Sequence, residues 1–192
     1  REVLDGLGQG DLLELGAGSG ALAAELLATL AVQGPLPERY LILEPSPELA
    51  ARQRERLAAR VPELFGRCQW LSQLPAHFNG VILANEVLDA MPVQRFRIGP
   101  NGTIDEVVVE RCEQGFAEAT APAAPALHTA VEALQRHGLA TQPGYCSEIN
   151  LRLAPWARAL AASLEAGLLL VTDYGYPRAE YYRDERHQGT LM

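Results

Sequence analysis

The feature that most constrains this chain is a short apolar run leading into closely spaced glycines. Leu12–Leu15 is bounded by turn residues, and Gly16, Gly18 and Gly20 follow it at two-residue intervals. In Ala21–Val32 the apolar residues then recur at helical spacing. Glycine lets the backbone turn without a Cβ, so a ligand can lie against the main chain at the N-terminus of the next helix. The segment predicts a strand, a glycine loop and a helix that begin a nucleotide-type cofactor site.

The glycines alone leave the ligand open. They could merely make a tight connection between strand and helix. Gly16, Gly18 and Ala21 also satisfy the looser dinucleotide fingerprint, in which alanine is accepted at the third position. Glu14 favours another cofactor, because a carboxylate two residues before the first glycine would face a pyrophosphate unfavourably. S-adenosylmethionine carries a sulfonium and an ammonium group and no phosphate, so an acid there suits it better.

Strand and helix patterns alternate along much of the chain. Buried strands are predicted over Leu12–Leu15, Tyr40–Glu44, Arg67–Leu71, Gly80–Ala84 and Gly167–Asp173, with helices over Ala21–Val32, from Pro47 to Ala59 and through Trp156 to Leu164. This rhythm is typical of an α/β fold with an open, mostly parallel, doubly wound sheet of the Rossmann-like type. Ligands of such sheets bind beyond the carboxyl ends of the strands.

From Val93 onward, the pattern changes to the alternation of exposed strands. An antiparallel meander is predicted over Val93–Ile98, Thr103–Arg111 and Phe116–Ala119, followed by an Ala/Pro linker over Thr120–Pro125 and a helix over Leu127–His137. We therefore divide the chain into the first part of the Rossmann-like domain (1–92), an inserted meander and helix (93–140) and a continuation with a tail loop (141–192). Since the chain opens inside a helix and ends before the sheet is complete, we expect it to be a fragment.

An acidic residue ends the second predicted strand. Glu44 lies 24 residues after Gly20, where the acid of nucleotide folds accepts hydrogen bonds from ribose hydroxyls. Ser46 and Pro47 make a good N-cap and first-turn pair, so a role for Glu44 in starting the next helix is the alternative.

The segment after the fourth predicted strand carries two further acids. Glu86 and Asp89 are three residues apart, and in a helical turn they would share one face. Two convergent carboxylates can bind a guanidinium through paired, charge-assisted hydrogen bonds. The structural alternative makes Asn85 an N-cap and both acids favourable neighbours of a helix N-terminus. Chemistry alone leaves both interpretations open.

Composition excludes several other classes of function. The formal net charge is -8 at pH 7, whereas phosphate binding needs a basic face, so we expect no nucleic-acid partner. All 16 basic residues are arginine, which excludes Schiff-base and P-loop lysine chemistry. Cys68, Cys112 and Cys146 have no CxxC spacing and the histidines no ligand pattern, so we expect no metal. No apolar run approaches the roughly 18 residues of a membrane span, and we expect a soluble, cytoplasmic protein of a bacterium without a membrane partner.

Taken together, the motifs resemble the MidA-like class I methyltransferases. The matching segments are Glu14–Gly20, Glu44–Ser46, Asn85–Pro92, Ser147–Glu148, Asp173–Gly175 and Gly189–Leu191. Mitochondrial relatives in that family are complex I assembly factors described as protein arginine methyltransferases. The resemblance implies S-adenosyl-L-methionine as cofactor, a protein substrate such as a respiratory-complex subunit, and the mitochondrial matrix as the location of a eukaryotic member.

The resemblance also implies a role for each candidate residue. Residues expected to bind the cofactor are Glu14, Gly16, Ala17, Gly18 and Gly20, with Glu44 on the ribose. Glu86 and Asp89 become the acids that bind a substrate guanidinium, and Asn85 shapes their turn. The family has a further N-terminal segment and further strands, and its tail usually reads tyrosine-tyrosine-histidine-proline where this chain has Tyr181–Asp184. The alternatives are a non-catalytic assembly factor that retains the cofactor fold and, less well supported, an NAD-dependent oxidoreductase.

Overall fold

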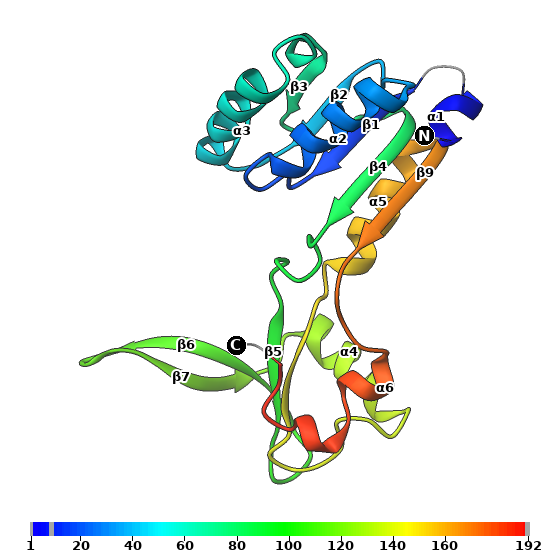
Figure 1. The fold of residues 1–192 in the computed structure, drawn as a ribbon. Helices are drawn as coiled ribbons and strands as arrows, with labels where there is room; N and C mark the ends of the chain where they lie inside the picture. The colour runs from blue at the N-terminus through cyan, green and yellow to red at the C-terminus, as the bar shows by residue number, and fades with distance from the viewer. Residues whose placement is uncertain (1, 8–9, 191–192) are drawn as a thin grey trace. The chain divides into compact units, whose positions relative to one another are not determined.

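The chain is divided into two compact units. The computed structural model describes residues 2–7 and 10–190. One unit runs through Ala90 and includes Trp156–Asp173, and the other comprises Met91–Pro155 and the residues from Tyr174 onward (Figure 1). Of the range 141–192, which the sequence interpretation assigns to a continuation of the Rossmann-like domain and a tail loop, Trp156–Asp173 belongs to the first unit and the other described residues belong to the second.

The first unit is built on a five-stranded parallel sheet. Its strands are β1 (Asp11–Leu15), β2 (Tyr40–Leu43), β3 (Cys68–Leu71), β4 (Phe78–Asn85) and β9 (Leu164–Thr172), in the order β3-β2-β1-β4-β9. Strands β2 and β3 are added in turn on one side of β1, and the chain then crosses to the other side of β1, where β4 pairs with it. The strand order therefore reverses between β1 and β4, the place where open α/β sheets bind ligands. The predicted α/β fold class is confirmed.

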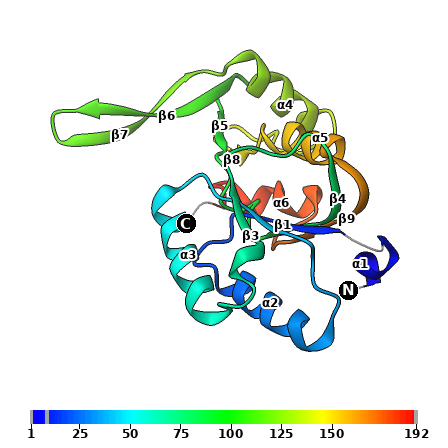
Figure 2. The same ribbon diagram turned by 90° about the horizontal axis from the view of Figure 1, so that it is seen from above.

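Helices cover both faces of this sheet. They are α1 (Glu2–Leu7), α2 (Ala21–Gln33), α3 (Pro47–Arg60) and α5 (Leu153–Ser163), with a short 3-10 turn at Phe65–Arg67. Leu27 of α2 and Leu57 of α3 are fully buried against one face, where they meet Tyr40 and Ile42. Helix α5 lies on the opposite face (Figure 2), and its Leu160 belongs to a second core cluster with Leu13 and Ile82. Among the described residues, no helix is long and apolar enough to cross a membrane.

The second unit is an antiparallel sheet with one covering helix. Its strands are β5 (Gln94–Ile98), β6 (Ile104–Cys112), β7 (Gly115–Pro122) and β8 (Cys146–Ile149), in the order β7-β6-β5-β8, and its helix is α4 (Pro125–Gln135). The meander is confirmed, but β7 extends to Pro122, so Thr120–Pro125 is not wholly a linker. Strand β8 was not predicted, because its Ser147 and Glu148 are buried polar residues that interrupt the apolar pattern.

The tail is more than the surface loop that the sequence predicts. It contains α6 (Arg178–Tyr181) and a 3-10 turn at Asp184–Arg186. The Glu148 carboxylate, 2% exposed, accepts hydrogen bonds from the Tyr181 hydroxyl at 2.7 Å and the Thr190 amide at 2.8 Å. Burial raises the pKa of Tyr181 to about 12, so its hydroxyl keeps the proton that it donates. The tail is thus fixed to β8; Leu191 of the last matching motif lies outside the described residues.

Gly80 of β4 supplies a test of the parallel sheet. A Cβ there would lie 1.9 Å from the Asp11 carbonyl oxygen, and the residue has φ +144°. We expect Gly80→Ala to lower the free energy of unfolding by about 3 kcal/mol, the sum of overpacking and backbone strain. The loss is measured by urea unfolding. Gly66→Ala is the control, since a Cβ at Gly66 meets nothing within 4 Å, and equal stability of both variants would contradict the register of β1 and β4.

Candidate functional site

Three neighbouring strands of the first unit reach one edge of the sheet in register. Leu15 of β1 is in register with Leu43 of β2 and with Ala84 of β4. The next residues along each strand are Gly16, Glu44 and Asn85, which the sequence singles out separately. Parallel pairing therefore brings the glycine loop, the acid after β2 and the segment after β4 to one edge of the sheet, on either side of the point where the strand order reverses.

The glycine loop has a backbone that only glycine adopts readily. Gly16, Gly18 and Gly20 have φ values of +61°, +52° and +76°. The Gly16 amide donates to the Leu43 carbonyl at 3.0 Å, which ties the loop to β2. A Cβ on Gly18 would meet nothing within 4 Å, so the loop is open at that point, while Ala17 is buried beneath it. The loop presents bare main chain at the carboxyl end of β1.

Helix α2 starts directly from this loop. Gly20 is its N-cap residue and has no side chain with which to bond the first amides. The first turn of a helix leaves its amides without intrahelical partners, and they carry partial positive charge. The N-terminus of α2 therefore offers hydrogen-bond donors beside the open loop.

Glu44 is held in place by the start of α3. One carboxylate oxygen accepts from the Ser46 amide at 3.0 Å, and the other accepts from Gln53 Nε2 at 3.0 Å. Ser46 in turn caps α3 by accepting from the Leu49 amide at 3.3 Å. Glu44 thus takes part in the start of α3, as the alternative interpretation of this acid expects. The same bonds hold its carboxylate at the carboxyl end of β2.

Gln53 is a site residue that the sequence interpretation missed. It is fully buried in α3, in a stripe with Ala50 and Leu57. Its Nε2 donates to the Gly18 carbonyl at 2.9 Å as well as to Glu44. The sequence did carry one signal for it, because Gln53 is a polar residue at a position of α3 where the helical spacing of Ala50 and Leu57 predicts an apolar one.

Glu14 lies in β1, two residues before the first glycine of the loop, and has a partner that the sequence did not indicate. It is 2% exposed in β1 and accepts a hydrogen bond from the Tyr40 hydroxyl at 2.7 Å. Burial raises the pKa of Glu14, an effect that the Tyr40 hydrogen bond partly opposes. The pKa of Tyr40 is also raised, first by burial and then by the Glu14 charge. The role of Glu14 toward a cofactor stays a prediction.

The segment after β4 is a non-helical turn, so the helical interpretation of Glu86 and Asp89 is wrong. Asn85 is the last residue of β4 rather than an N-cap, and Glu86 has φ +50°, unusual for a residue with a side chain. The Glu86 amide donates to the Thr172 carbonyl at 2.8 Å, and the Leu88 amide donates to the Asp173 carboxylate at 2.7 Å. The tip of β9 therefore shapes this turn, where the Glu86 and Asp89 side chains are exposed.

Val87 connects this turn to the glycine loop. Its side chain packs into the core beside Leu15, and its Cγ2 lies 3.7 Å from where a Cβ on Gly16 would stand. The two exposed acids of the turn are thus carried on a segment that contacts the first glycine. The predicted cofactor loop and the predicted substrate acids are brought together at one edge.

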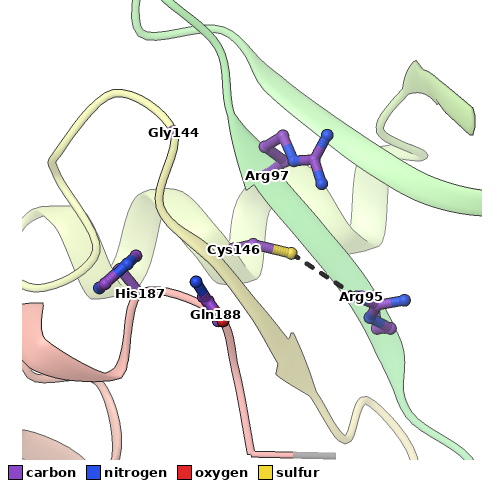
Figure 3. A pocket seen from close by; sticks show the side chains of 6 residues that line it. All are labelled: Arg95, Arg97, Gly144, Cys146, His187 and Gln188. Carbon is purple, nitrogen blue, oxygen red and sulfur yellow. Dashed lines mark hydrogen bonds between the residues drawn. The ribbon is translucent and has the colours of Figure 1, made fainter. Parts of the chain in front are cut away.

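The second unit has a separate pocket of about 550 Å³. It is lined by Arg95, Arg97, Gly144, Cys146, His187 and Gln188 (Figure 3). Arg95 forms an ion pair with Glu118, and its Nη2 lies 4.0 Å from the Cys146 Sγ. None of the predicted site residues lines this pocket. Within the described parts of the chain, no group of three or more His, Cys, Asp or Glu side chains could hold a metal ion.

Comparison with known proteins decides the family. The family model described as "Putative S-adenosyl-L-methionine-dependent methyltransferase" matches residues 2–192. The chain belongs to this methyltransferase family. Its resemblance to MidA-like methyltransferases is confirmed at that level. None of the curated proteins compared with it matches.

Two solved structures from Burkholderia thailandensis support the assignment to this family. Both are 40% identical to the chain over 98% of its length, with a TM-score of 0.87. One of them is bound to S-adenosyl-homocysteine, and the other is a native structure. The chain covers 48% and 50% of these two relatives, so it spans about half of their length.

The raised pKa of Glu14 predicts a pH-dependent stability. A carboxyl group whose pKa is raised on folding binds more protons in the native state, so stability falls as pH rises above 4.5, the ordinary value, and through the raised pKa. We expect Glu14→Gln, which keeps an acceptor for Tyr40, to be more stable than the wild type at neutral pH and no more stable below pH 4.5. Urea unfolding at both ends of this range measures the difference, and a stabilisation that does not change with pH would show that the Glu14 charge is not its source.

Proposed function

We propose that this chain holds S-adenosylmethionine at the loop Gly16–Gly20 and directs its methyl group to a guanidinium nitrogen of a protein arginine. The observation that carries the proposal is the parallel register of β1, β2 and β4, which gathers the open loop, Glu44 and the Glu86 turn at one edge of the sheet. In the family, the 40% identical relative from Burkholderia thailandensis binds S-adenosyl-homocysteine, which supports the same ligand here.

The residues present fit this cofactor. The loop is open at Gly18, and the first amides of α2 have no side-chain cap, as a ligand lying against the loop and the helix N-terminus requires. Glu44, fixed by Ser46 and Gln53, would accept hydrogen bonds from the ribose hydroxyls. Glu14, buried in β1 two residues before the loop, would provide negative charge toward the cationic methionine end. A pyrophosphate would meet the same negative charge unfavourably, which argues against a dinucleotide.

The acids of the turn after β4 would do the substrate chemistry. When bound, the cofactor supplies a methyl group on a sulfonium sulfur; the S–C bond breaks, an N–C bond forms, and the bonding electrons stay on sulfur. A guanidinium is protonated at neutral pH and must lose a proton as its nitrogen is methylated. Glu86 and Asp89 would orient the guanidinium, balance its charge and accept that proton. The strained φ of Glu86 supports a functional turn, since such conformations cluster at active sites.

The acceptor we propose is an arginine side chain of a protein, with a respiratory-complex subunit as the substrate class that the resemblance implies. The two exposed carboxylates favour a cationic acceptor over a neutral hydroxyl or an acid. A scaffold that binds the cofactor without transferring methyl would use the same loop and would not need the acids of the turn.

Calorimetric titration of the full-length protein with S-adenosyl-homocysteine and, separately, with NADH tests the cofactor. We expect saturable binding of the first and none of the second, with Glu44→Gln weakening the first by about tenfold or more, the value of one hydrogen bond to a charged group. Binding of NADH alone would overturn the proposal in favour of an oxidoreductase.

Replacement of Glu86 tests the acceptor chemistry. We expect Glu86→Gln to reduce methylation of arginine-containing protein substrates by about a hundredfold or more, since a positioned acid or base contributes about that much. Its affinity for S-adenosyl-homocysteine should be unchanged.

The matched control for that replacement is Glu63→Gln, because Glu63 is exposed and precedes β3, away from the edge that holds the loop. Mass spectrometry of the substrate reads out the product. Equal losses of turnover and cofactor affinity in Glu86→Gln would assign Glu86 a structural role, and methylation of a residue other than arginine would refute the proposed acceptor.

A further inference from the structure

We propose that Gln53 is a positioning residue for the cofactor: its side-chain amide sets the Glu44 carboxylate and the glycine loop in one arrangement. This inference rests on the proposed function, because it assigns Gln53 to the site that would hold S-adenosylmethionine. Nothing in the motif pattern of the loop or of the strand tips includes this residue.

The amide of Gln53 is bonded on both sides. Nε2 donates to the Gly18 carbonyl at 2.9 Å and to the Glu44 carboxylate at 3.0 Å. Oε1 accepts from the Trp70 indole at 2.9 Å. The two hydrogens of Nε2 thus serve the two elements that the cofactor would contact, the loop after β1 and the acid after β2.

Gln53 cannot move independently of the loop. It is fully buried, and its Cα and Cγ lie 3.2 Å from where a Cβ on Gly20 would stand. Gly20 is therefore packed tightly against the backbone of Gln53, while the side chain of Gln53 is hydrogen-bonded to Gly18. The loop is fixed at its middle by a hydrogen bond and at its end by van der Waals contact.

Trp70 sets the orientation of the amide. An indole can only donate, so its bond requires the oxygen of Gln53 to face β3 and the nitrogen to face Glu44 and Gly18. The Arg54 guanidinium lies over the Trp70 ring, 4.5 Å from its centre, and this cation–π contact helps to hold the indole in place. The amide therefore has one satisfied orientation, with both donor hydrogens directed toward the site.

The consequence for ligand binding is preorganisation. A Glu44 carboxylate held through both oxygens by Ser46 and Gln53 needs no reordering to accept the ribose hydroxyls, and ordering a long side chain on binding costs affinity. A glutamate at position 53 would keep the shape and the acceptor for Trp70, but it would put a second carboxylate against Glu44 and against the Gly18 carbonyl.

The test is calorimetric titration of the full-length protein with S-adenosyl-homocysteine. We expect Gln53→Met, which keeps the volume and removes the amide, to weaken binding by about tenfold to a hundredfold, and Gln53→Glu to weaken it at least as much. Arg52→Gln on the same helix is the control, since Arg52 is exposed and pairs with Glu48, and its affinity should match that of the wild type. Urea unfolding checks that each variant is folded at the titration temperature.

A double-mutant cycle with Glu44→Gln separates positioning from support of the fold. If Gln53 acts through Glu44, then Gln53→Met costs less affinity once the Glu44 carboxylate is gone, because the shared effect is already lost. Equal losses in both backgrounds would overturn the inference, as would full affinity of Gln53→Met or Gln53→Glu. Failure of the wild type to bind S-adenosyl-homocysteine would instead refute the proposed function itself.

Discussion

The backbone pairing of β1 with its two neighbours is the constraint on which the site depends. Because β1 is central and parallel to β2 and β4, Leu15, Leu43 and Ala84 lie in the same register row at the carboxyl edge of the sheet. A shift of one residue in either pairing would move an acid away from the glycine loop and exchange the faces on which its strand's side chains pack. Burial of the strand side chains therefore fixes the geometry of polar groups that do not contact one another directly.

Much of this arrangement could be predicted from local patterns. The apolar runs of β1, β2 and β4 and the glycines after β1 are strong signals, because a buried parallel strand must be nearly continuous in apolar residues. Once the sheet is parallel, Glu44 and Glu86 have to lie at its carboxyl edge. The periodicity of α2 and α3 follows from the same need to cover a face of the sheet.

The rest depends on contacts that no local pattern encodes. The sequence predicts a helical turn after β4. In the structure, two amides of this turn donate hydrogen bonds to acceptors at the end of β9, about 85 residues later, and hold the turn in another shape. Strand β8 has buried polar residues whose partners lie in the tail. Gln53 shows the same limit, because a buried amide is informative only when its partners Gly18, Glu44 and Trp70 are known.

The Glu148 interaction has a consequence for the order in which the second unit can form during synthesis. The partners of this carboxylate, Tyr181 and Thr190, follow it by 33 and 42 residues. When β5 to β8 have left the ribosome, the Tyr181 hydroxyl and the Thr190 amide have not yet been synthesised. The Glu148 carboxylate must then stay hydrated, because burying an unpaired carboxylate is costly. The antiparallel sheet can therefore reach its final packing only after β9 has been made. The segment that carries Tyr181 and Thr190 follows β9 in the chain, so the buried hydrogen bonds of Glu148 are among the last of the second unit to form.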